Sequence, residues 1–387
     1  MRVQVMPAPV VAAVAAAARL PSRRRQSSFS WEGGVRSGCM PLKPVARAEA
    51  GARYAALYDS YEQNVRWIQR QADWELAALP KAVKEVADFY FNKRLKATSD
   101  APYYNISPMV GRPLPYLAFW LCDDLGVDDE RVRRTLGLAL IFASISVSAY
   151  DDLLEGALDA VSHRLFIARY FWARHASLVA ELAGDKLKVH ELLVVENISH
   201  IYGEVYSLFS SYPVTVNPLS EKHISKFSQY LVSVCYPSLA AIFIMKGNSD
   251  ALPSLNKFLH NYCMGWRIVD DMRDCRDDLL RGDAGKSAVI SYVMWHLKLS
   301  RIDLPTLTAA LLEPEILEGL YKAIDRHYKA AARVAREMNS QRLLDFVVGQ
   351  REGHRVEQAR FQSFRDGLCA FLNGIEHRAL TPDLCPR

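Results

Sequence analysis

The sequence predicts an all-α protein, a single helical bundle built around a buried apolar middle. Three observations lead to this prediction. From residue 51 onward, apolar residues recur three and four positions apart, the spacing that places them on one face of a helix. Segments that alternate apolar and polar residues, as half-buried strands do, are missing from the sequence. Half of the 387 residues are hydrophobic, so the chain can bury a sizeable core.

The helical pattern divides the chain into segments joined by stretches with turn chemistry. Predicted helices cover residues 53–91, 128–156, 158–183, 186–210, 219–246, 251–282, 314–338 and 341–373. The breaks between them, such as "GNSDALPS" and "LRGDAGKS", are rich in Gly, Pro, Asn, Asp and Ser. The segment 128–156 is apolar nearly all round, which is typical of a central buried helix. We therefore expect one all-helical domain over residues 51–387.

The first 50 residues differ in composition from the rest of the chain. They hold eight of the 48 basic residues and two of the 43 acidic ones, so the remainder, with 40 basic and 41 acidic residues, is nearly neutral. A nucleic-acid-binding body is therefore not expected. An Arg-, Ala- and Ser-rich leader that is poor in acids fits an organelle transit peptide, or else a disordered leader. The first alternative implies a plastid or other organelle, and the second a cytoplasmic protein.

Two further features bound the class of protein. No uninterrupted apolar run reaches the ~18–20 residues that a membrane span needs, so stable membrane insertion is not expected. The seven cysteines are scattered, with no two at CxxC spacing. This argues against a structural zinc site or a disulfide framework, and for a reducing compartment.

The stretch "GWRIVDDMRDCRDDLLRGDAGK" (265–286) crowds five aspartates into nine positions of a predicted helix. Asp270, Asp274 and Asp278 lie four residues apart, which makes a gently winding stripe on one face, with Trp266 one turn before it. Because like charges repel, such a stripe needs compensation, and Mg²⁺ prefers carboxylate oxygens as ligands. The alternative is an exposed acidic helix end whose charges pair with nearby arginines (Arg273, Arg276 and Arg281).

A second carboxylate cluster ends the central apolar helix. Asp151, Asp152 and Glu155 follow small residues at Ser144, Val147 and Ser148 that lead toward Asp151 on the same face. Acidic residues at a helix C-terminus oppose the helix dipole, so a metal ion is a natural compensation. Two such clusters, each at the end of an apolar helix, are expected to face one another across a cavity.

A third aspartate-rich stretch, "CDDLGVDDERV" (122–132), is predicted to be structural. Its paired aspartates sit in a loop and at a helix start. Aspartate side chains there accept hydrogen bonds from the free N–H groups of the first turn. Capping therefore explains this stretch without a metal.

Two of these motifs carry a family resemblance. "SVSAYDDLLEG" (146–156) and "FLHNYCMGWRIVDDMRDCRDDLLRGDAGK" (258–286) resemble the first and second aspartate-rich motifs of the trans-isoprenyl diphosphate synthases, in the class I terpenoid synthase superfamily. "GRPLPYLAFWL" (111–121) resembles a remnant of that family's basic GKRxRP element. The resemblance extends weakly over about residues 100–300. It implies a class I terpenoid-synthase-like helical bundle around a central apolar cavity.

The resemblance also implies a cofactor, a substrate and a set of site residues. The cofactor would be Mg²⁺, as three ions that bridge the two carboxylate clusters and the diphosphate of a prenyl diphosphate. The implied metal ligands are Asp151, Asp152, Glu155, Asp270, Asp271, Asp274 and Asp278. Lys286, Arg112 and Arg267 are the candidates to hold the diphosphate, and Asp151, Asp270, Lys286 and Arg112 the candidate catalytic residues. A homodimer is implied by the resemblance alone.

A carbocation formed when diphosphate leaves needs a dry cavity, and aromatic faces can steady it. The candidate cavity residues are Trp266, Tyr150, Val147, Ser148, Arg267 and Phe142. For Phe142 the alternative is a place in the plain core.

The choice between prenyl transfer and cyclisation depends on basic residues. A chain-elongating synthase binds two diphosphates, yet the GKRxRP remnant keeps only Arg112, "EGALDAVSHRLF" (155–166) lacks the RRG signature and "VCYPSLA" (234–240) lacks a lysine. One diphosphate can still be held. The sequence therefore favours a Mg²⁺-dependent terpene cyclase, a lyase that releases diphosphate. The alternatives are a prenyltransferase that condenses an allylic diphosphate with isopentenyl diphosphate, or a catalytically idle subunit of one.

Overall fold

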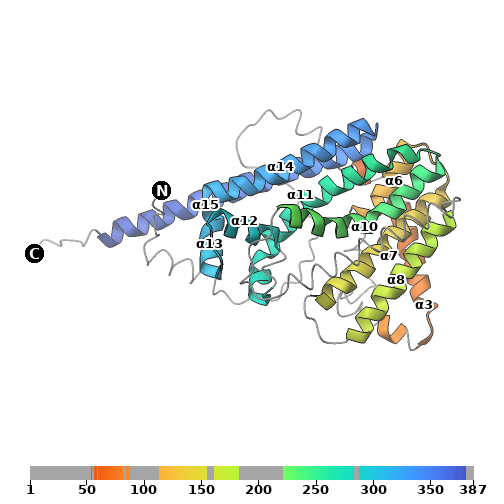
Figure 1. Ribbon diagram of the computed structural model, residues 1–387, viewed down its shortest axis with the longest axis horizontal. Coiled ribbons are helices and arrows are strands. Elements are labelled where there is room, and N and C mark those ends of the chain that lie inside the picture. Colours follow the sequence, from red (N-terminus) through yellow and green to blue (C-terminus); the bar gives the residue numbers. More distant parts are fainter. Residues whose placement is uncertain are drawn as a thin grey trace, which may run out of the picture.

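All regular structure in the described part of the chain is helical (Figure 1). The computed structural model describes residues 54, 56–58, 60–81, 84–87, 113–154, 161–182, 221–282 and 287–380. Its helices are α3 (Glu62–Ala77), α6 (Leu114–Asp124), α7 (Glu130–Leu154), α8 (Val161–Leu182), α10 (Glu221–Met245), α11 (Leu252–Arg281), α12 (Ala288–His296), α13 (Leu304–Leu312), α14 (Pro314–Glu337) and α15 (Gln341–Leu380), with a 3₁₀ turn η1 at Ser249–Ala251.

Most of the predicted helices are confirmed to within a few residues. The predictions for 128–156, 158–183, 219–246, 251–282 and 314–338 correspond to α7, α8, α10, α11 and α14, and α15 runs seven residues past the predicted end at 373. The predicted helix over 186–210 lies outside the described residues. Periodicity does not single out the short helices α12 and α13, because nine residues give little more than two turns.

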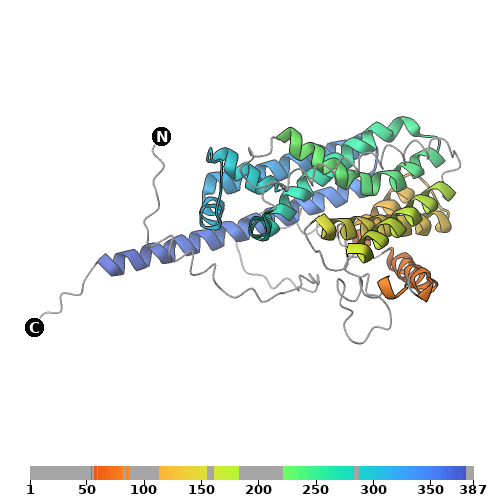
Figure 2. The same ribbon diagram turned by 60° about the horizontal axis from the view of Figure 1, so that its bottom comes forward.

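The helices α7 and α11 run in the same direction, and α10 runs against both. The Nζ of Lys246, at the end of α10, donates to the backbone oxygen of Gly126, in the turn that precedes α7, at 3.3 Å. The chain passes from Lys246 through η1 directly into α11. The start of α7, the end of α10 and the start of α11 therefore share one end of the bundle, as both views show (Figures 1 and 2).

One face of α7 is packed tightly against α8. The rings of Phe142 and Phe171 lie 5.1 Å apart, and both side chains are fully buried. The hydroxyl of Ser146 donates to the backbone oxygen of Ala168 at 2.7 Å, which satisfies it inside the core. Phe142 therefore belongs to the core between α7 and α8.

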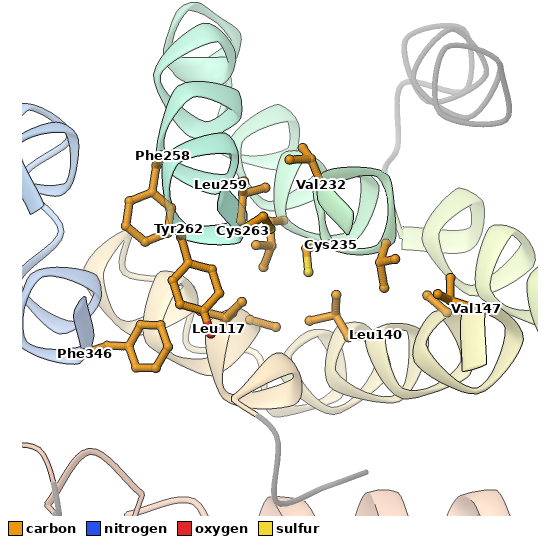
Figure 3. Packing of buried hydrophobic residues seen from close by; sticks show 14 of the residues in the cluster. Leu117, Leu140, Val147, Val232, Cys235, Phe258, Leu259, Tyr262, Cys263 and Phe346 are labelled. Carbon is orange, nitrogen blue, oxygen red and sulfur yellow. The ribbon is translucent and has the colours of Figure 1, made fainter. Parts of the chain in front are cut away.

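The opposite face of α7 looks toward α10 and α11. Leu140 is two residues, or about 200°, away from Phe142 around the helix. The side chain of Leu140 points toward Cys235 on α10, with Cys263 of α11 and Leu117 of α6 nearby, and Val147 lies further along α7 on the same face (Figure 3). Apolar side chains from four helices thus meet here, and this meeting point is called the apolar floor below.

The segment Glu130–Tyr150 is long and apolar enough to cross a membrane by length and composition. Within the described part of the chain, 83% of its apolar window is buried among the other helices. Its apolar surface is thus used for packing on α3, α6, α8 and α10.

The helix α11 is backed by α14 and flanked by α15. A Cβ at Gly265 would lie 3.0 Å from the ring of Tyr328 on α14, so any side chain there would require the buried ring to shift by a few tenths of an ångström. Tyr262 packs against Phe346 of α15, with ring centres 5.1 Å apart. The far end of α15 projects beyond the bundle (Figures 1 and 2).

Candidate metal and diphosphate site

The aspartates of α11 are divided between two faces of the helix. Asp270 lies seven residues after Cys263, nearly two full turns, and therefore shares the face that looks toward α10 and the apolar floor. Asp274 follows one turn later on the same side. Asp271 is 100° further round and faces α12, and Asp278, seven residues after it, lies on that side too. The predicted stripe of Asp270, Asp274 and Asp278 thus begins on the side of α11 that faces the apolar floor. It ends at Asp278, on the same side of the helix as Asp271.

Asp271 is buried and anchors the start of α12. The backbone N–H of Ala288 donates to its Oδ2 at 2.6 Å, and the Nε of Arg267 lies 3.4 Å from the same oxygen. A carboxylate at a helix N-terminus is favoured by the helix dipole. Burial nevertheless raises the pKa of Asp271 to about 6, although Arg267 and the Ala288 N–H act to lower it.

Asp274 and Asp278 also carry raised pKa values. Burial and, to a lesser extent, the charge of Asp271 raise the pKa of Asp278 to about 7, although Arg281 lies 2.6 Å away. Burial raises the pKa of Asp274 as well, against the lowering influence of Arg281. The arginines within the motif therefore do not fully compensate its carboxylates. An oxygen-only donor set in need of positive charge fits a hard divalent cation such as Mg²⁺.

The end of α7 brings the first cluster to the same height. Position 151 lies eleven residues, about three turns, after Leu140 and shares its face of the helix. At ~1.5 Å per residue, position 151 is roughly 30 Å along α7 and position 270 roughly 27 Å along α11, measured from starts at the same end of the bundle. Position 151, near the end of α7, and Asp270, within α11, therefore reach a similar level.

Several predicted site residues lie outside the description. The backbone at Asp151 and Asp152 belongs to α7, but their side chains are not described. The remaining three, Glu155, Arg112 and Lys286, lie outside the described residues altogether. Among the side chains that are described, no three His, Cys, Asp or Glu groups converge on one point as metal ligands do. The Mg²⁺ site therefore remains a prediction that the α11 carboxylates fit.

The predicted cavity residues occupy different places. Val147 and Ser148 are buried, while Tyr150 and Trp266 are partly buried and pack against the core. Arg267 is mostly buried beside Asp271 and not in the apolar floor. Phe142, as described above, packs against α8. Two surface pockets lined by described residues, of about 710 and 630 Å³, lie away from these side chains.

Sequence reasoning missed the part that α12 plays in positioning the second motif. Ser287 caps α12, since its hydroxyl accepts from the N–H of Ile290 at 3.3 Å, and this fixes the N–H of Ala288 against Asp271. A serine directly before the apolar run "AVISYV" is the signal that predicts such a cap. Asp271 thereby joins the second motif to the start of α12.

Comparison with known proteins places the fold. No family model and no curated protein matches the sequence. Solved structures do match: a decaprenyl diphosphate synthase from Rhodobacter capsulatus gives a TM-score of 0.59 at 15% identity, covering 78% of this chain and 99% of that one. A geranylgeranyl pyrophosphate synthetase from the archaeon Geoglobus acetivorans gives 0.61 at 11% identity, with the same coverages of 78% and 99%.

A third solved structure, the octaprenyl pyrophosphate synthase from Helicobacter pylori, gives a TM-score of 0.54 at 13% identity, covering 74% of this chain and 97% of that one. At such identities the likeness establishes the fold. The chain has the all-α fold of the trans-isoprenyl diphosphate synthases, the fold of the class I terpenoid synthase superfamily. The fold expected from the two aspartate motifs is confirmed.

Proposed function

We propose that the protein is a Mg²⁺-dependent enzyme of prenyl diphosphates and that its reaction is prenyl transfer. The observation that carries the proposal is that position 151, near the end of α7, and Asp270, within α11, lie at a similar level on the helix faces that look toward the apolar floor. The structures that share the fold are synthases of decaprenyl, geranylgeranyl and octaprenyl diphosphates. This likeness supports prenyl transfer over the cyclisation that the sequence favoured.

Mg²⁺, when bound, would supply positive charge that holds the diphosphate and stabilises its departure. The carboxylates of Asp270 and Asp274 would hold the cation from α11, and those at positions 151 and 152 from α7. The apolar floor would exclude water, which would otherwise capture a carbocation. Trp266, one turn before Asp270, offers an aromatic face to that cation.

Cyclisation is the second candidate, and one feature of α10 favours it. The described stretch of α10 within "VCYPSLA" offers no basic side chain for a second diphosphate. The hydroxyl of Ser238 in this stretch is buried without a hydrogen-bond partner among the described residues. A single diphosphate substrate would need no second basic set.

The test is incubation with geranyl, farnesyl and geranylgeranyl diphosphates, each with and without isopentenyl diphosphate, in the presence of Mg²⁺. Longer prenyl diphosphates formed only when isopentenyl diphosphate is present are the expected result. Volatile hydrocarbon from a single diphosphate would establish the cyclase instead. No product in any tube would overturn both reactions and leave the catalytically idle subunit.

The matched control uses Asp151→Ala and Asp270→Ala, one from each cluster. Each is expected to abolish turnover while far-UV circular dichroism keeps the wild-type helical signal. An active double variant would rule out the assignment of the two clusters as the metal site.

A further inference from the structure

A basic groove runs between α14 and α15, away from the two aspartate clusters. It encloses about 630 Å³, and no residue of α7 or α11 lines it. The cations that line it are Lys322, Arg326, Lys329, Arg333, Arg351 and Arg355. A pocket of this volume is in the range of small-molecule sites.

The charges of this groove are unbalanced. Six cationic side chains and two carboxylates line the groove, and Glu352 and Glu337 pair with two of the cations from its edge, which leaves an excess of two positive charges among these side chains. On α14 the four cations follow one another at intervals of four, three and four residues, which puts them on a single helix face. They are Lys322, Arg326, Lys329 and Arg333. Residues 51–387, which include this groove, hold 40 basic and 41 acidic residues, so this concentration of cations is local.

One carboxylate positions the cations that cross the groove. Asp325 accepts from the Nε of Arg351 at 2.5 Å and pairs with Lys329 at 2.7 Å and with Arg355 at 3.5 Å. Burial acts against its ionisation, yet the hydrogen bonds from Arg351 and Lys329 lower its pKa below the ordinary value. Three cations thus converge on one carboxylate. Asp325 can balance only one of these three positive charges.

The remaining acids near the groove form exposed pairs along their own helices. Glu318 pairs with Lys322 at 2.9 Å, and Glu352 pairs with Arg355 at 2.6 Å. The carboxylate of Glu337 lies 3.9 Å from Arg333, at the edge of ion-pair distance. Exposed pairs of this kind contribute little net stability, so a multivalent anion can displace them.

The floor of the groove is closed by aromatic packing. Tyr328 is fully buried, and the ring of His354 stacks on it with centres 5.5 Å apart and an interplanar angle of 7°. A concave site with a rigid floor suits a compact ligand better than a flat surface does. Guanidinium groups held in place by a carboxylate are suited to bind phosphate oxygens in pairs.

We propose that this groove binds a soluble phosphorylated anion through its phosphate oxygens, at a site separate from the aspartate clusters. Arg351 and Arg355 contact the anion from α15, and Lys329 with its neighbours on the same face contacts it from α14. Diphosphate, with several oxygens on a compact frame, is the simplest ligand of this class. Its binding at the groove needs no divalent cation.

The test is isothermal titration calorimetry with inorganic diphosphate in the presence of EDTA, which removes the cations that the aspartates would need. The wild-type protein is expected to bind one diphosphate, and added NaCl is expected to weaken the binding. Lys329→Gln/Arg355→Gln is expected to bind at least about tenfold more weakly, because two charge-assisted contacts are lost. The control, Arg66→Gln/Arg131→Gln, removes two exposed charges on α3 and α7 and should bind like wild type.

A second groove variant keeps the test valid if Lys329→Gln/Arg355→Gln does not fold. Lys322→Gln/Arg326→Gln changes only exposed residues of α14, and it should also weaken binding while the control does not. Equal affinity in wild type and in both groove variants would overturn the proposal, as would no heat of binding in wild type.

Cosedimentation with vesicles tests whether the groove binds a soluble phosphorylated anion or the phosphate of a lipid headgroup. Cosedimentation with phosphatidylglycerol vesicles that depends on the groove cations, without binding of free diphosphate, would replace the soluble ligand by a membrane surface. All titrations are made without Mg²⁺ and without turnover. Failure here would therefore leave the proposed prenyl transfer untouched, and loss of turnover in the aspartate variants would leave the groove untouched.

Discussion

Two Asp-Asp pairs of this chain differ in the positive charge that surrounds their carboxylates. Asp123 and Asp124 end α6, where Arg133 lies 2.6 Å from Asp123 and Arg342 reaches both carboxylates at 2.9 and 3.0 Å. The hydroxyl of Ser340 also donates to Asp124 at 2.5 Å. Every carboxylate charge here has a guanidinium beside it, and the pair joins α6 to the start of α15.

Asp270 and Asp271 lie in the second aspartate motif, where burial of Asp271 outweighs the arginine beside it. Asp271 has one partner of opposite charge, Arg267 at 3.4 Å, and its pKa stays raised because burial outweighs that partner. The pKa of Asp278 is raised as well, and burial is again the largest cause. The same dipeptide is thus matched by guanidinium groups at the end of α6, whereas burial outweighs Arg267 at Asp271.

The largest expected effect separates the two pairs by activity. Asp270→Asn and Asp274→Asn should each lower turnover by about a hundredfold or more, because a cation ligand is lost. We expect Mg²⁺ to raise the melting temperature of the wild type, and these substitutions should abolish that rise. Asp124→Asn is the matched control: it should lower the melting temperature and keep turnover per folded molecule. If Asp124→Asn lost turnover at an intact fold while Asp270→Asn kept it, the comparison would be reversed.

The next effect concerns how α11 is held from behind. Gly265→Val would bring side-chain atoms against the buried ring of Tyr328, where a Cβ alone already lies 3.0 Å away. Overpacking of this kind should cost about 2–3 kcal/mol of unfolding free energy, measured by urea denaturation. Gly353→Ala on α15, where nothing lies within 4 Å of the added Cβ, should be neutral or stabilising by up to ~1 kcal/mol. Equal losses in the two variants would contradict close packing at Gly265.

The ion pairs of Asp123 and Asp124 with Arg342 should stabilise the fold less than their number of contacts suggests. Arg342→Ala leaves Asp123 and Asp124 with fewer partners, but its side chain is 40% exposed, so solvent screens part of the interaction. We expect a loss of about 1–2 kcal/mol in urea denaturation, with turnover unchanged. Arg66→Ala, which removes an exposed pair with Glu62 on α3, should change stability less. A loss no larger than that of Arg66→Ala would mean that this junction adds no stability.

The helices could be predicted from the sequence because periodicity is local. The partners of the third aspartate stretch could not. Capping explains Asp129, whose Oδ1 accepts from the N–H groups of Arg131 and Val132 at 2.8 and 3.3 Å. It does not explain Asp123 and Asp124, for which the prediction of capping is wrong. Arg342 lies 218 residues beyond Asp124, and a local sequence pattern cannot predict a contact over that separation.

The candidate site shows the same limit. The spacing of the α11 aspartates gives their faces directly, because a helix turns 100° per residue. It does not reveal which face meets α12, since that depends on how the chain returns after α11. Phe142 illustrates the problem for the core: an apolar helix all round gives no sign of which side faces α8.

The smallest expected effect tests whether an arginine inside the second motif neutralises it. Arg273 is exposed and pairs with Glu357 of α15 at 3.3 Å, on the side of α11 turned away from Asp271. We expect Arg273→Gln to change unfolding free energy by less than about 0.5 kcal/mol, as for other exposed pairs, and turnover by less than about threefold. Arg267→Gln is the informative contrast, since Arg267 is mostly buried against Asp271 and should affect turnover and Mg²⁺ affinity more. A larger loss of turnover in Arg273→Gln than in Arg267→Gln would show that the exposed arginine, and not the buried one, serves the carboxylate cluster.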